Sequence, residues 1–425
     1  MRFTRLSTSA YSRFAYDQDR ILFPQLPGYA AERRAEGTDV AEVGVVDTVD
    51  GEEKIVAAAL IRYQPWKKIF KRVNIAYGPT LDYSNTELTR FFFDELIKYV
   101  KKDKTVLSIR FNPLLPKTFY EDITPVSDNP VATTFEETMT RLGGVRIPRE
   151  FYDAADIQAR FFYTKDISGM TFQEVTKSVG QVVRTGFNRA GTPGVTVRFL
   201  EENEFDILQD ILSHTADRSA MQEISDQAME FYRGLKRTRP DRVFAPVAVL
   251  NCDEYLAGVE AEVTELEAKI ATIDEQEASL QAEGKNLAKK QRTARNEARD
   301  RLGVLERRAE ETREHQAKSG NEIILAGSFY IACPNELVYL LSGSYREYQS
   351  YYGIYLIHRA MLEWATENEI DRYNTFGITG IFTDEASDAG VLHFKRQFKG
   401  NVEEFVGTWD IPVRPRLAKR LDAIG

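Results

Sequence analysis

The sequence predicts a mixed α/β protein whose second half is interrupted by a long antiparallel helical hairpin. Through most of the 425 residues, short runs rich in β-branched and aromatic residues alternate with helical patterns. Residues 256–318 differ, because they form a proline-free and mostly polar stretch. Apolar residues recur there at alternating steps of three and four, which is typical of coiled-coil pairing.

The first half contains predicted strands around one well-delimited helix. The strands are Val40–Val46, Lys54–Tyr63 and Val106–Phe111. The helix covers Asn85–Lys102, and Asn85 is a suitable N-cap because its side chain can accept from a free backbone N–H.

The second half repeats this order of strands, helix and strand, which suggests duplicated domains. Thr171 and Glu174 form a capping-box pattern at the start of one helix. The predicted helices are Thr171–Asn188, Glu202–Arg218, Asp226–Arg237 and Tyr351–Asn368. The predicted strands are Val195–Leu200, Arg242–Asn251, Glu322–Cys333, Leu337–Leu341 and Arg372–Phe376.

Two apolar seams separated by Gly284 predict that residues 256–318 fold back on themselves. The seams are Val259, Val263, Leu266, Ile270, Ile273 and Leu280, then Leu287, Ala294, Ala298, Leu302, Leu305 and Ala309. Each arm of roughly 28 residues would be about 40 Å long. An element of this length between two predicted strands replaces a β-turn and projects into solvent, so we expect it to contact a partner.

The charges of this hairpin are divided between its halves. Residues 256–283 carry eight acids and one base, whereas residues 285–301 carry seven bases and two acids. Some of these charges should pair across the hairpin. The remaining bases suit a phosphate backbone, and the candidates are Lys285, Lys289, Lys290, Arg292 and Arg295. The alternative is a solvated, salt-bridged spacer arm.

The composition excludes several classes of protein. A net charge of −9 argues against a general nucleic-acid coat protein, and we expect no stable DNA binding. The only two cysteines, Cys252 and Cys333, indicate a reducing compartment. There is no signal-peptide pattern and no apolar run of about 18 residues, so we expect a cytoplasmic protein. Peripheral contact with the membrane stays open.

The common catalytic motifs are missing. The sequence has no Gly-x-Ser-x-Gly, no Walker loop, no His-Glu-x-x-His and no Cys-x-x-Cys, so it predicts no metal site. Gln25–Ala30 matches the Gln-x-x-Gly-x-Ala loop with which acetyltransferases hold coenzyme A. Its position before any predicted strand is wrong for that role, because the loop needs a preceding strand and a following helix to aim its amides.

Five segments resemble the Fem (FemABX) family of peptidoglycan aminoacyltransferases. Tyr77–Tyr83 and Arg110–Pro113 are similar to motifs of the first domain in that family. Tyr373–Gly380, Gly390–Phe398 and Val406–Pro412 are similar to motifs of the second domain. The resemblance covers nearly the whole chain, and the helical hairpin lies where some members carry a coiled-coil arm.

The resemblance implies a specific architecture and reaction. It implies two acetyltransferase-like (GNAT) domains, at residues 1–160 and at 161–255 with 319–425, and an inserted coiled-coil arm at 256–318. Members transfer an amino acid from aminoacyl-tRNA to the stem peptide of a peptidoglycan precursor, either lipid II or UDP-MurNAc-pentapeptide. This builds the interpeptide bridge of the cell wall. No metal or small-molecule cofactor is expected.

The resemblance also implies roles for single residues. Lys395 is the catalytic candidate, because a fixed ammonium stabilises the oxyanion that forms when an amine attacks an ester. Phe394 would lie with it beside the 3′ end of the tRNA, and Arg33 and Arg218 could hold the diphosphate of the precursor. The alternatives are a lysine that snorkels from a buried strand and ordinary surface arginines. Tyr373 and Phe376 belong to one of the matching motifs. We expect both to pack the core rather than to contact substrate.

Two departures from the family pattern stand out. Asn112 replaces a common aspartate and cannot act as a base, and Leu341 replaces a tyrosine. Two other functions stay open: a GNAT-fold N-acyltransferase that uses acyl-CoA, and a non-catalytic tRNA-binding adaptor.

Overall fold

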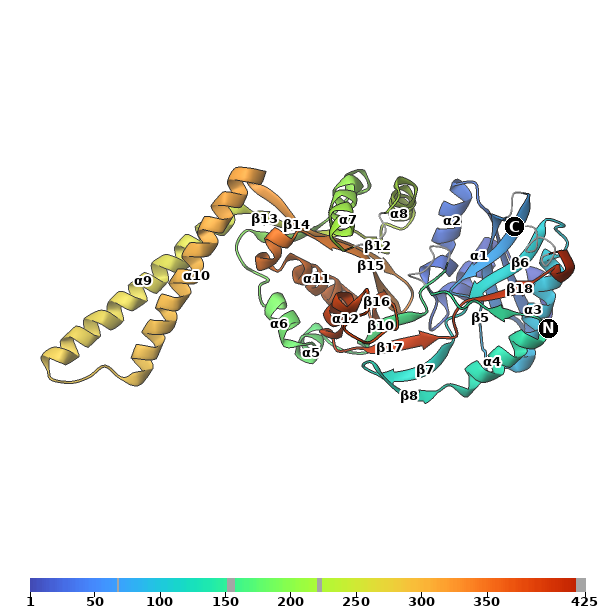
Figure 1. Ribbon diagram of the computed structural model, residues 1–425, viewed down its shortest axis with the longest axis horizontal. Coiled ribbons are helices and arrows are strands. Elements are labelled where there is room, and N and C mark those ends of the chain that lie inside the picture. The colour runs from blue at the N-terminus through green and yellow to red at the C-terminus, as the bar shows by residue number, and fades with distance from the viewer. Residues whose placement is uncertain (67–68, 151–156, 220–223, 418–425) are drawn as a thin grey trace.

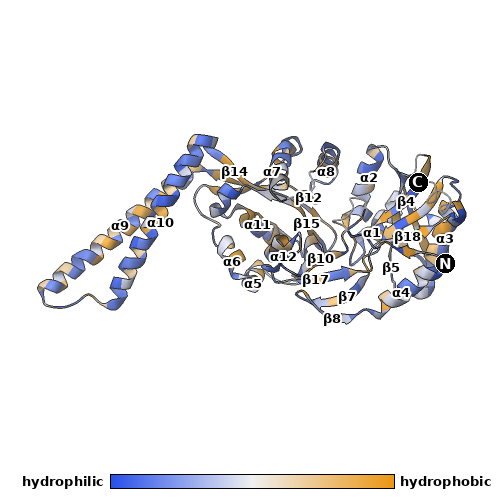
Figure 2. Ribbon diagram, in the orientation of Figure 1, coloured by the Kyte–Doolittle hydropathy of each residue, from blue (hydrophilic) through white to orange (hydrophobic). Residues whose placement is uncertain are grey.

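The protein has two β-sheets lined by helices and a pair of long helices that projects from one end (Figure 1). The computed structural model describes residues 1–66, 69–150, 157–219 and 224–417. Apolar residues concentrate in the sheets and in parts of the helices around them, while the projecting pair carries many hydrophilic residues (Figure 2). None of the described helices has an apolar stretch long enough to cross a membrane.

The first sheet has the strand order β1-β2-β3-β4-β6-β18-β9, with β5 paired to β3. Its strands are β1 (Arg2–Arg5), β2 (Asp39–Val49), β3 (Glu52–Trp66), β4 (Phe70–Ala76), β5 (Thr80–Leu81), β6 (Val106–Asn112), β9 (Val145–Arg146) and β18 (Trp409–Pro412). The accompanying helices are α1 (Thr8–Tyr16), η1 (Phe23–Gln25), α2 (Pro27–Ala35), α3 (Thr86–Val100) and α4 (Pro130–Arg141). Asn85 caps α3 as predicted, since its side chain accepts from the backbone N–H of Leu88 at 2.9 Å.

The second sheet has the order β11-β13-β14-β15-β16-β10-β17-β7-β8, with β12 paired to β14. Its strands are β7 (Pro116–Glu121), β8 (Thr124–Asp128), β10 (Phe161–Asp166), β11 (Val195–Phe199), β12 (Val243–Phe244), β13 (Pro246–Asn251), β14 (Glu322–Ala332), β15 (Glu336–Ser344), β16 (Arg372–Ile378) and β17 (Asn401–Phe405). Its helices are α5 (Phe172–Ser178), α6 (Gln181–Phe187), η3 (Glu202–Glu204), α7 (Phe205–Ser219), α8 (Asp226–Thr238), η4 (Arg346–Tyr351), α11 (Gly353–Glu367) and α12 (Ala389–Arg396).

The two sheets exchange strands, so the predicted boundary at residue 160 does not separate them. The late strand β18 pairs with β6 in the first sheet, while the early strands β7 and β8 extend the second sheet beyond β17. Trp409 and Ile411 of β18 are buried in the core of the first sheet. A strand joins the sheet whose core covers its apolar side chains, and its position in the chain does not decide this.

The predicted helix Thr171–Asn188 is two helices, α5 and α6, separated at Gly180. The backbone N–H of Gly180 donates to the carbonyl of Gln397 at 2.7 Å, and a Cβ at Gly180 would lie 2.9 Å from that same oxygen. The close approach of the segment after α12 therefore interrupts the helix. The capping box of Thr171 and Glu174 is present as predicted.

The projecting pair consists of α9 (Cys252–Ala282) and α10 (Lys289–Ser319), each of 31 residues. They run in opposite directions and are joined at the tip by a loop, where Gly284 has a φ of +71° (Figure 1). The pair follows β13 and precedes β14, and α9 begins four residues before position 256. We call this pair the arm.

The base of the arm is part of the second core. Tyr255 and Val259 of α9 and Leu305 and Ala309 of α10 are buried in one cluster with residues of the second sheet. The hydroxyl of Thr312 lies 2.8 Å from that of Tyr351. Apolar packing and a buried hydrogen bond therefore fix the base of the arm to the core of the second sheet, so the arm is more than a long β-connection.

Candidate functional site

Lys395 is buried under the end of β16 and does not lie on a strand. It is on α12, its side chain is only 5% exposed, and its Nζ donates to the carbonyls of Phe376 at 3.2 Å and Gly377 at 2.7 Å. An ammonium has three N–H donors, so a third remains for another acceptor. The alternative given above, a lysine that snorkels from a buried strand, is therefore wrong, because Lys395 is on a helix.

The surroundings of Lys395 place its protonation equilibrium near neutral pH. Burial lowers the pKa of Lys395 to about 7, and the charge of nearby Asp388 partly opposes this effect. Asp388 is itself held by the backbone N–H of Thr379 at 2.8 Å and by its hydroxyl at 2.6 Å. Near pH 7 both the ammonium and the neutral amine are present, so this group can stabilise negative charge or exchange a proton.

Phe376 brings the motifs of the two halves together. It adopts a φ of +65°, uncommon for a residue with a side chain, and its ring stacks on Phe162 with centroids 5.1 Å apart. The ring of Tyr77 from the first-half motif packs edge-on against Phe376 at 6.3 Å. Asn112 accepts a hydrogen bond from the backbone N–H of Tyr77 at 3.1 Å. Asn112 thus has a positioning contact that needs no acid.

An aromatic cluster supports the strand behind Lys395. Tyr373 is fully buried, and its hydroxyl is hydrogen-bonded to Nδ1 of His358 and to the hydroxyl of Tyr330. Burial lowers the pKa of His358 to about 3, so this histidine is neutral at physiological pH. Phe394 packs on His358 and Phe398. The core role predicted for Tyr373 is confirmed. Phe394 is half-buried, and its ring packs against this cluster.

Arg33 is on α2, and its side chain lies between α2 and α8. It is therefore not an ordinary surface arginine. Its guanidinium carbon is 3.6 Å from the centre of the Phe231 ring and 5.0 Å from that of Tyr29. Nη1 forms an ion pair with Glu36 at 2.8 Å. Its Nε is buried and has no hydrogen-bond partner within the described chain. The side chain of Arg218, on α7, lies outside the described residues.

Two of the five predicted phosphate-binding bases of the arm form ion pairs within the arm. Lys285 pairs with Glu283 at 2.9 Å, and Arg295 is 14% exposed and pairs with Asp274 at 2.6 Å and with Glu277. Arg299 and Arg301 also pair with acids of α9. In the described part of the chain, Lys289, Lys290 and Arg292 form no ion pair, and all three are exposed. These three are the free cations near the tip.

Gln25 is a structural residue and not part of a coenzyme A loop. Its fully buried side chain accepts from the backbone N–H of Leu60 at 2.8 Å and donates to the carbonyls of Leu60 and Ala76 at 3.2 and 2.9 Å. It lies in the short helix η1, which follows no strand of a βα unit. The segment Gln25–Ala30 therefore lacks the directly preceding strand that such a loop needs to aim its amides.

Two polar groupings were not found from the sequence. Arg20 binds Glu336 and Glu403 of the second sheet, and Arg189 and Arg308 line a cavity at the base of the arm. The signal for the first was weak, because Glu336 is the first residue of β15 and Glu403 stands beside Glu404 in the short strand β17. Nothing local marks the second, whose members are more than a hundred residues apart.

Comparisons with known proteins match the chain along nearly its full length. The model of the FemAB family matches residues 6–424. The chain is 30% identical over 415 residues to proteins named aminoacyltransferase FemA from Staphylococcus aureus strains MW2 and COL, with 97% of this chain and 96% of each relative covered. The crystal structure of FemX superposes with a TM-score of 0.77 at 18% identity, covering 99% of both chains, which shows a common fold. This chain therefore belongs to the FemAB family.

Proposed function

We propose that this protein is an aminoacyltransferase that moves an amino acid from aminoacyl-tRNA to the stem-peptide amino group of a peptidoglycan precursor. The observation that carries the proposal is the match of the FemAB family over residues 6–424, together with relatives named aminoacyltransferase. The acceptor is lipid II or UDP-MurNAc-pentapeptide, and the product is a residue of the interpeptide bridge. Both substrates place the reaction in the cytoplasm, and the lipid-linked acceptor would bring the protein to the inner face of the membrane.

The chemistry needs little more than positioning and charge. The acceptor amine attacks the ester carbonyl, a C–N bond forms, and the C–O bond to the 3′ ribose breaks. The amine proton leaves to water or a carboxylate, and the tRNA hydroxyl takes up a proton. Lys395, with two N–H groups held by the carbonyls of Phe376 and Gly377, directs its third donor at the carbonyl oxygen as it becomes negative.

The architecture that goes with this reaction is two acetyltransferase-like domains with a coiled-coil arm inserted in the second. Each sheet contains a parallel strand pair joined through a helix, β4 and β6 through α3, and β15 and β16 through α11. This equivalence supports a duplication. The ion pairs between α9 and α10, such as the one from Arg301 to Glu262, support the coiled coil.

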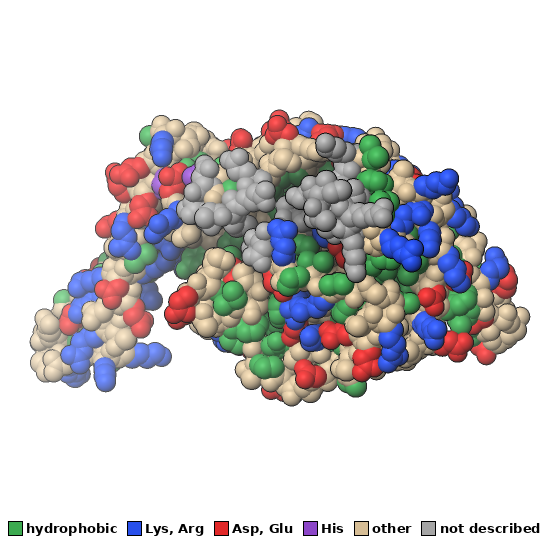
Figure 3. Space-filling view, turned by 45° about the vertical axis from the view of Figure 1, so that its right-hand side comes forward, with side chains coloured by type: hydrophobic (Ala, Val, Ile, Leu, Met, Phe, Trp, Pro, Cys, Tyr) green, Lys and Arg blue, Asp and Glu red, His purple; other side chains and the backbone are tan. Residues whose placement is uncertain are grey.

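Substrate binding is divided over three places. Arg33, whose side chain is 24% exposed, would hold the precursor diphosphate, with Arg218 as a second candidate. Phe394 would contact the aminoacylated end of the tRNA beside Lys395. Lys289, Lys290 and Arg292 near the tip of the arm would contact the tRNA backbone. Figure 3 shows lysine and arginine side chains along the arm, interleaved with acids.

One assay tests the reaction directly. The purified protein is incubated with a panel of charged tRNAs and with lipid II or UDP-MurNAc-pentapeptide, and the acceptor is weighed by mass spectrometry. We expect a mass increase of one aminoacyl residue with at least one charged tRNA. Binding of tRNA without any product would favour the adaptor, and product from acetyl-CoA would favour the N-acyltransferase. Either result overturns the proposal.

A further inference from the structure

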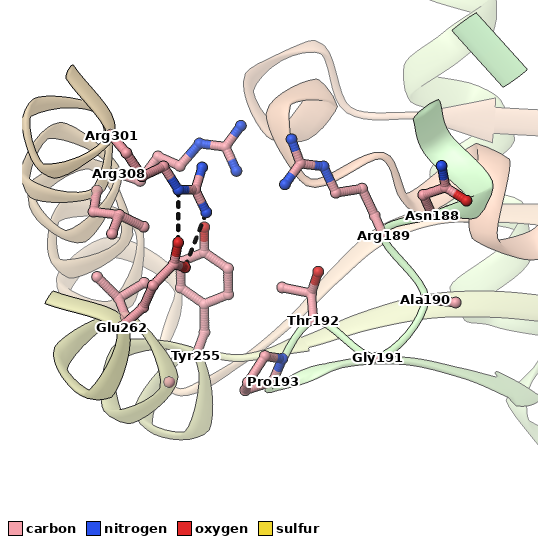
Figure 4. Close-up of a pocket in the computed structure, with 13 residues that line it drawn as sticks. Asn188, Arg189, Ala190, Gly191, Thr192, Pro193, Tyr255, Glu262, Arg301 and Arg308 are labelled. Atoms are coloured by element: carbon pink, nitrogen blue, oxygen red, sulfur yellow. Dashed lines mark hydrogen bonds and ion pairs between the residues drawn. The ribbon is translucent and has the colours of Figure 1, made fainter. Parts of the chain in front are cut away.

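A cavity of about 270 Å³ lies where the arm joins the second sheet. One wall is the loop from Asn188 to Pro193, which connects α6 to β11. The other wall is the base of the arm, with Tyr255, Gly258 and Glu262 from α9 and Arg301 and Arg308 from α10. Figure 4 shows Arg189 pointing from the loop toward the arginines of α10 across this space.

The cavity has an excess of positive charge. Its lining carries three guanidinium groups, from Arg189, Arg301 and Arg308, and one carboxylate, from Glu262. Arg301 is engaged, since its Nε and Nη2 lie 2.7 and 2.9 Å from the two oxygens of Glu262. Within the described residues, Arg189 and Arg308 form no ion pair. Two arginines therefore line the cavity without forming an ion pair within the described residues.

The carboxylate responds to all three arginines. The hydrogen bond from Arg301 is the largest cause that lowers the pKa of Glu262, burial opposes it, and the charges of Arg301, Arg189 and Arg308 each lower it by less. This places both guanidinium groups within electrostatic reach of the Glu262 carboxylate, which lines the cavity. An acceptor with several oxygens beside this carboxylate would lie among arginine N–H donors.

The walls of the cavity are held in place by close packing. A Cβ added to Gly258 would lie 2.6 Å from side-chain atoms of Pro193, and one added to Gly194 would lie 2.5 Å from the backbone of Asn251 and Tyr255. The backbone N–H of Asn251 also donates to the carbonyl of Gly194 at 2.7 Å. The loop therefore packs tightly against the first turns of α9. This packing fixes the position of the loop that carries Arg189. Gly191, by contrast, has nothing within 4 Å on its Cβ side, which leaves that edge of the loop open.

We propose that this cavity binds a phosphodiester group of the tRNA backbone, with Arg189 and Arg308 as its two ligands. Arginine suits this ligand because its planar fork can donate two N–H bonds to one phosphate. The site lies on the same arm as the free bases Lys289, Lys290 and Arg292, so one RNA backbone could be held at the tip and at the base. The inference rests on the proposed function, because it assumes that tRNA is the substrate.

Glu262 sets the strength of this site. By occupying Arg301 it removes one of three cations, which limits the attraction for phosphate. Replacing Glu262 by glutamine keeps a hydrogen-bond acceptor for Arg301 but removes the negative charge. This change should strengthen phosphate binding, whereas a purely structural role of the Glu262–Arg301 pair would give no gain.

The test measures binding of a fluorescently labelled, unacylated tRNA over a range of salt concentrations. The variants are Arg189→Gln with Arg308→Gln, and Glu262→Gln alone. The matched control is Arg307→Gln, an exposed base adjacent to Arg308 that does not line the cavity. Binding of UDP-MurNAc-pentapeptide is measured on the same proteins, and circular dichroism checks their folding.

We expect the double variant to bind tRNA more weakly. The fall of log K with log salt should become less steep by about 1.4–1.8, the value for two phosphate contacts. Glu262→Gln should bind tRNA more tightly, and precursor affinity should not change. A slope equal to that of Arg307→Gln overturns the inference, and a loss confined to the precursor assigns the site to its diphosphate instead. If the unaltered protein fails to bind any tRNA, the proposed function itself fails, and the two failures are thereby distinguished.

Discussion

Arg20 holds Glu336 in a two-point ion pair, with Nε 3.0 Å from Oε2 and Nη2 2.8 Å from Oε1. The same guanidinium binds Glu403 at 2.7 and 2.8 Å. The amide of Asn374 donates to Glu336 at 2.7 Å, and the hydroxyl of Thr164 donates to Glu403 at 2.8 Å. One arginine from the N-terminal region is thus tied to β15 and β17 of the second sheet.

Arg20→Met should destabilise the protein by about 3–5 kcal/mol, because it leaves the 1%-exposed Glu336 without its partner. Urea unfolding measures the change in free energy. The control is Arg2→Met, whose partner Glu53 is 71% exposed and whose loss should cost under about 1 kcal/mol. Equal effects of the two substitutions would show that the Arg20 network contributes nothing special to stability.

Lys395→Met should lower turnover at saturating tRNA and acceptor by about 10²–10³-fold, the range seen when one oxyanion donor is removed. Methionine keeps the length of the side chain without the charge. Lys177→Met on the exposed face of α5 is the control and should be neutral. Turnover is followed by mass spectrometry and folding by circular dichroism. Near-normal turnover would exclude Lys395 from the reaction.

The buried Lys395 should make stability increase with pH above neutrality. Its pKa is about 7 in the folded protein, whereas the ordinary value is 10.5. Between these values the unfolded chain binds a proton that the folded protein does not, so the free energy of unfolding rises with pH, by at most about 1.4 kcal/mol per unit. Lys395→Met should lose this rise in urea titrations between pH 7 and 10. An unchanged slope would mean that Lys395 keeps an ordinary pKa.

Replacing Lys289, Lys290 and Arg292 by glutamine should weaken tRNA binding and reduce its salt slope by about 2.1–2.7, at 0.7–0.9 per contact. Arg295→Gln is the comparison, because Arg295 is engaged with Asp274 and Glu277 and should instead weaken the pairing of the arm. Precursor affinity should be the same in both variants. If the triple variant retains the affinity and slope of the unaltered protein, the tip does not contact tRNA.

Shortening the arm should be tolerated only beyond its buried base. Replacing residues 271–297 by a short Gly-Ser turn leaves Tyr255, Val259, Leu305 and Ala309 in the core and should change the free energy of unfolding little. Replacing everything between Tyr255 and Asn321 removes buried side chains and should cost several kcal/mol, about 2–5 for each large one lost. Urea unfolding compares the two, and equal stability would show that the base is not part of the core.

The sequence by itself determined several of the elements and their order, but it did not indicate helices such as α1, α2 and α4 or the strands β7 and β8. Apolar spacing specified α9 and α10, and local capping chemistry specified the starts of α3 and α5 at Asn85 and Thr171. These features depend on residues within a few positions of one another, so they are visible in a linear sequence. The ordered motifs also pointed to Lys395 as the catalytic candidate.

Only the tertiary structure decided which strands share a sheet and which charges are free. The strand β18 belongs to the first sheet because Trp409 and Ile411 pack into the core of that sheet. Its partner strand β6 lies some 300 positions earlier in the sequence. The same holds for Arg295, which is neutralised across the arm, and for Arg189 and Arg308, which meet at its base. Burial and pairing are set by contacts between distant segments, and those contacts determine the charge and pKa that a side chain presents to a substrate.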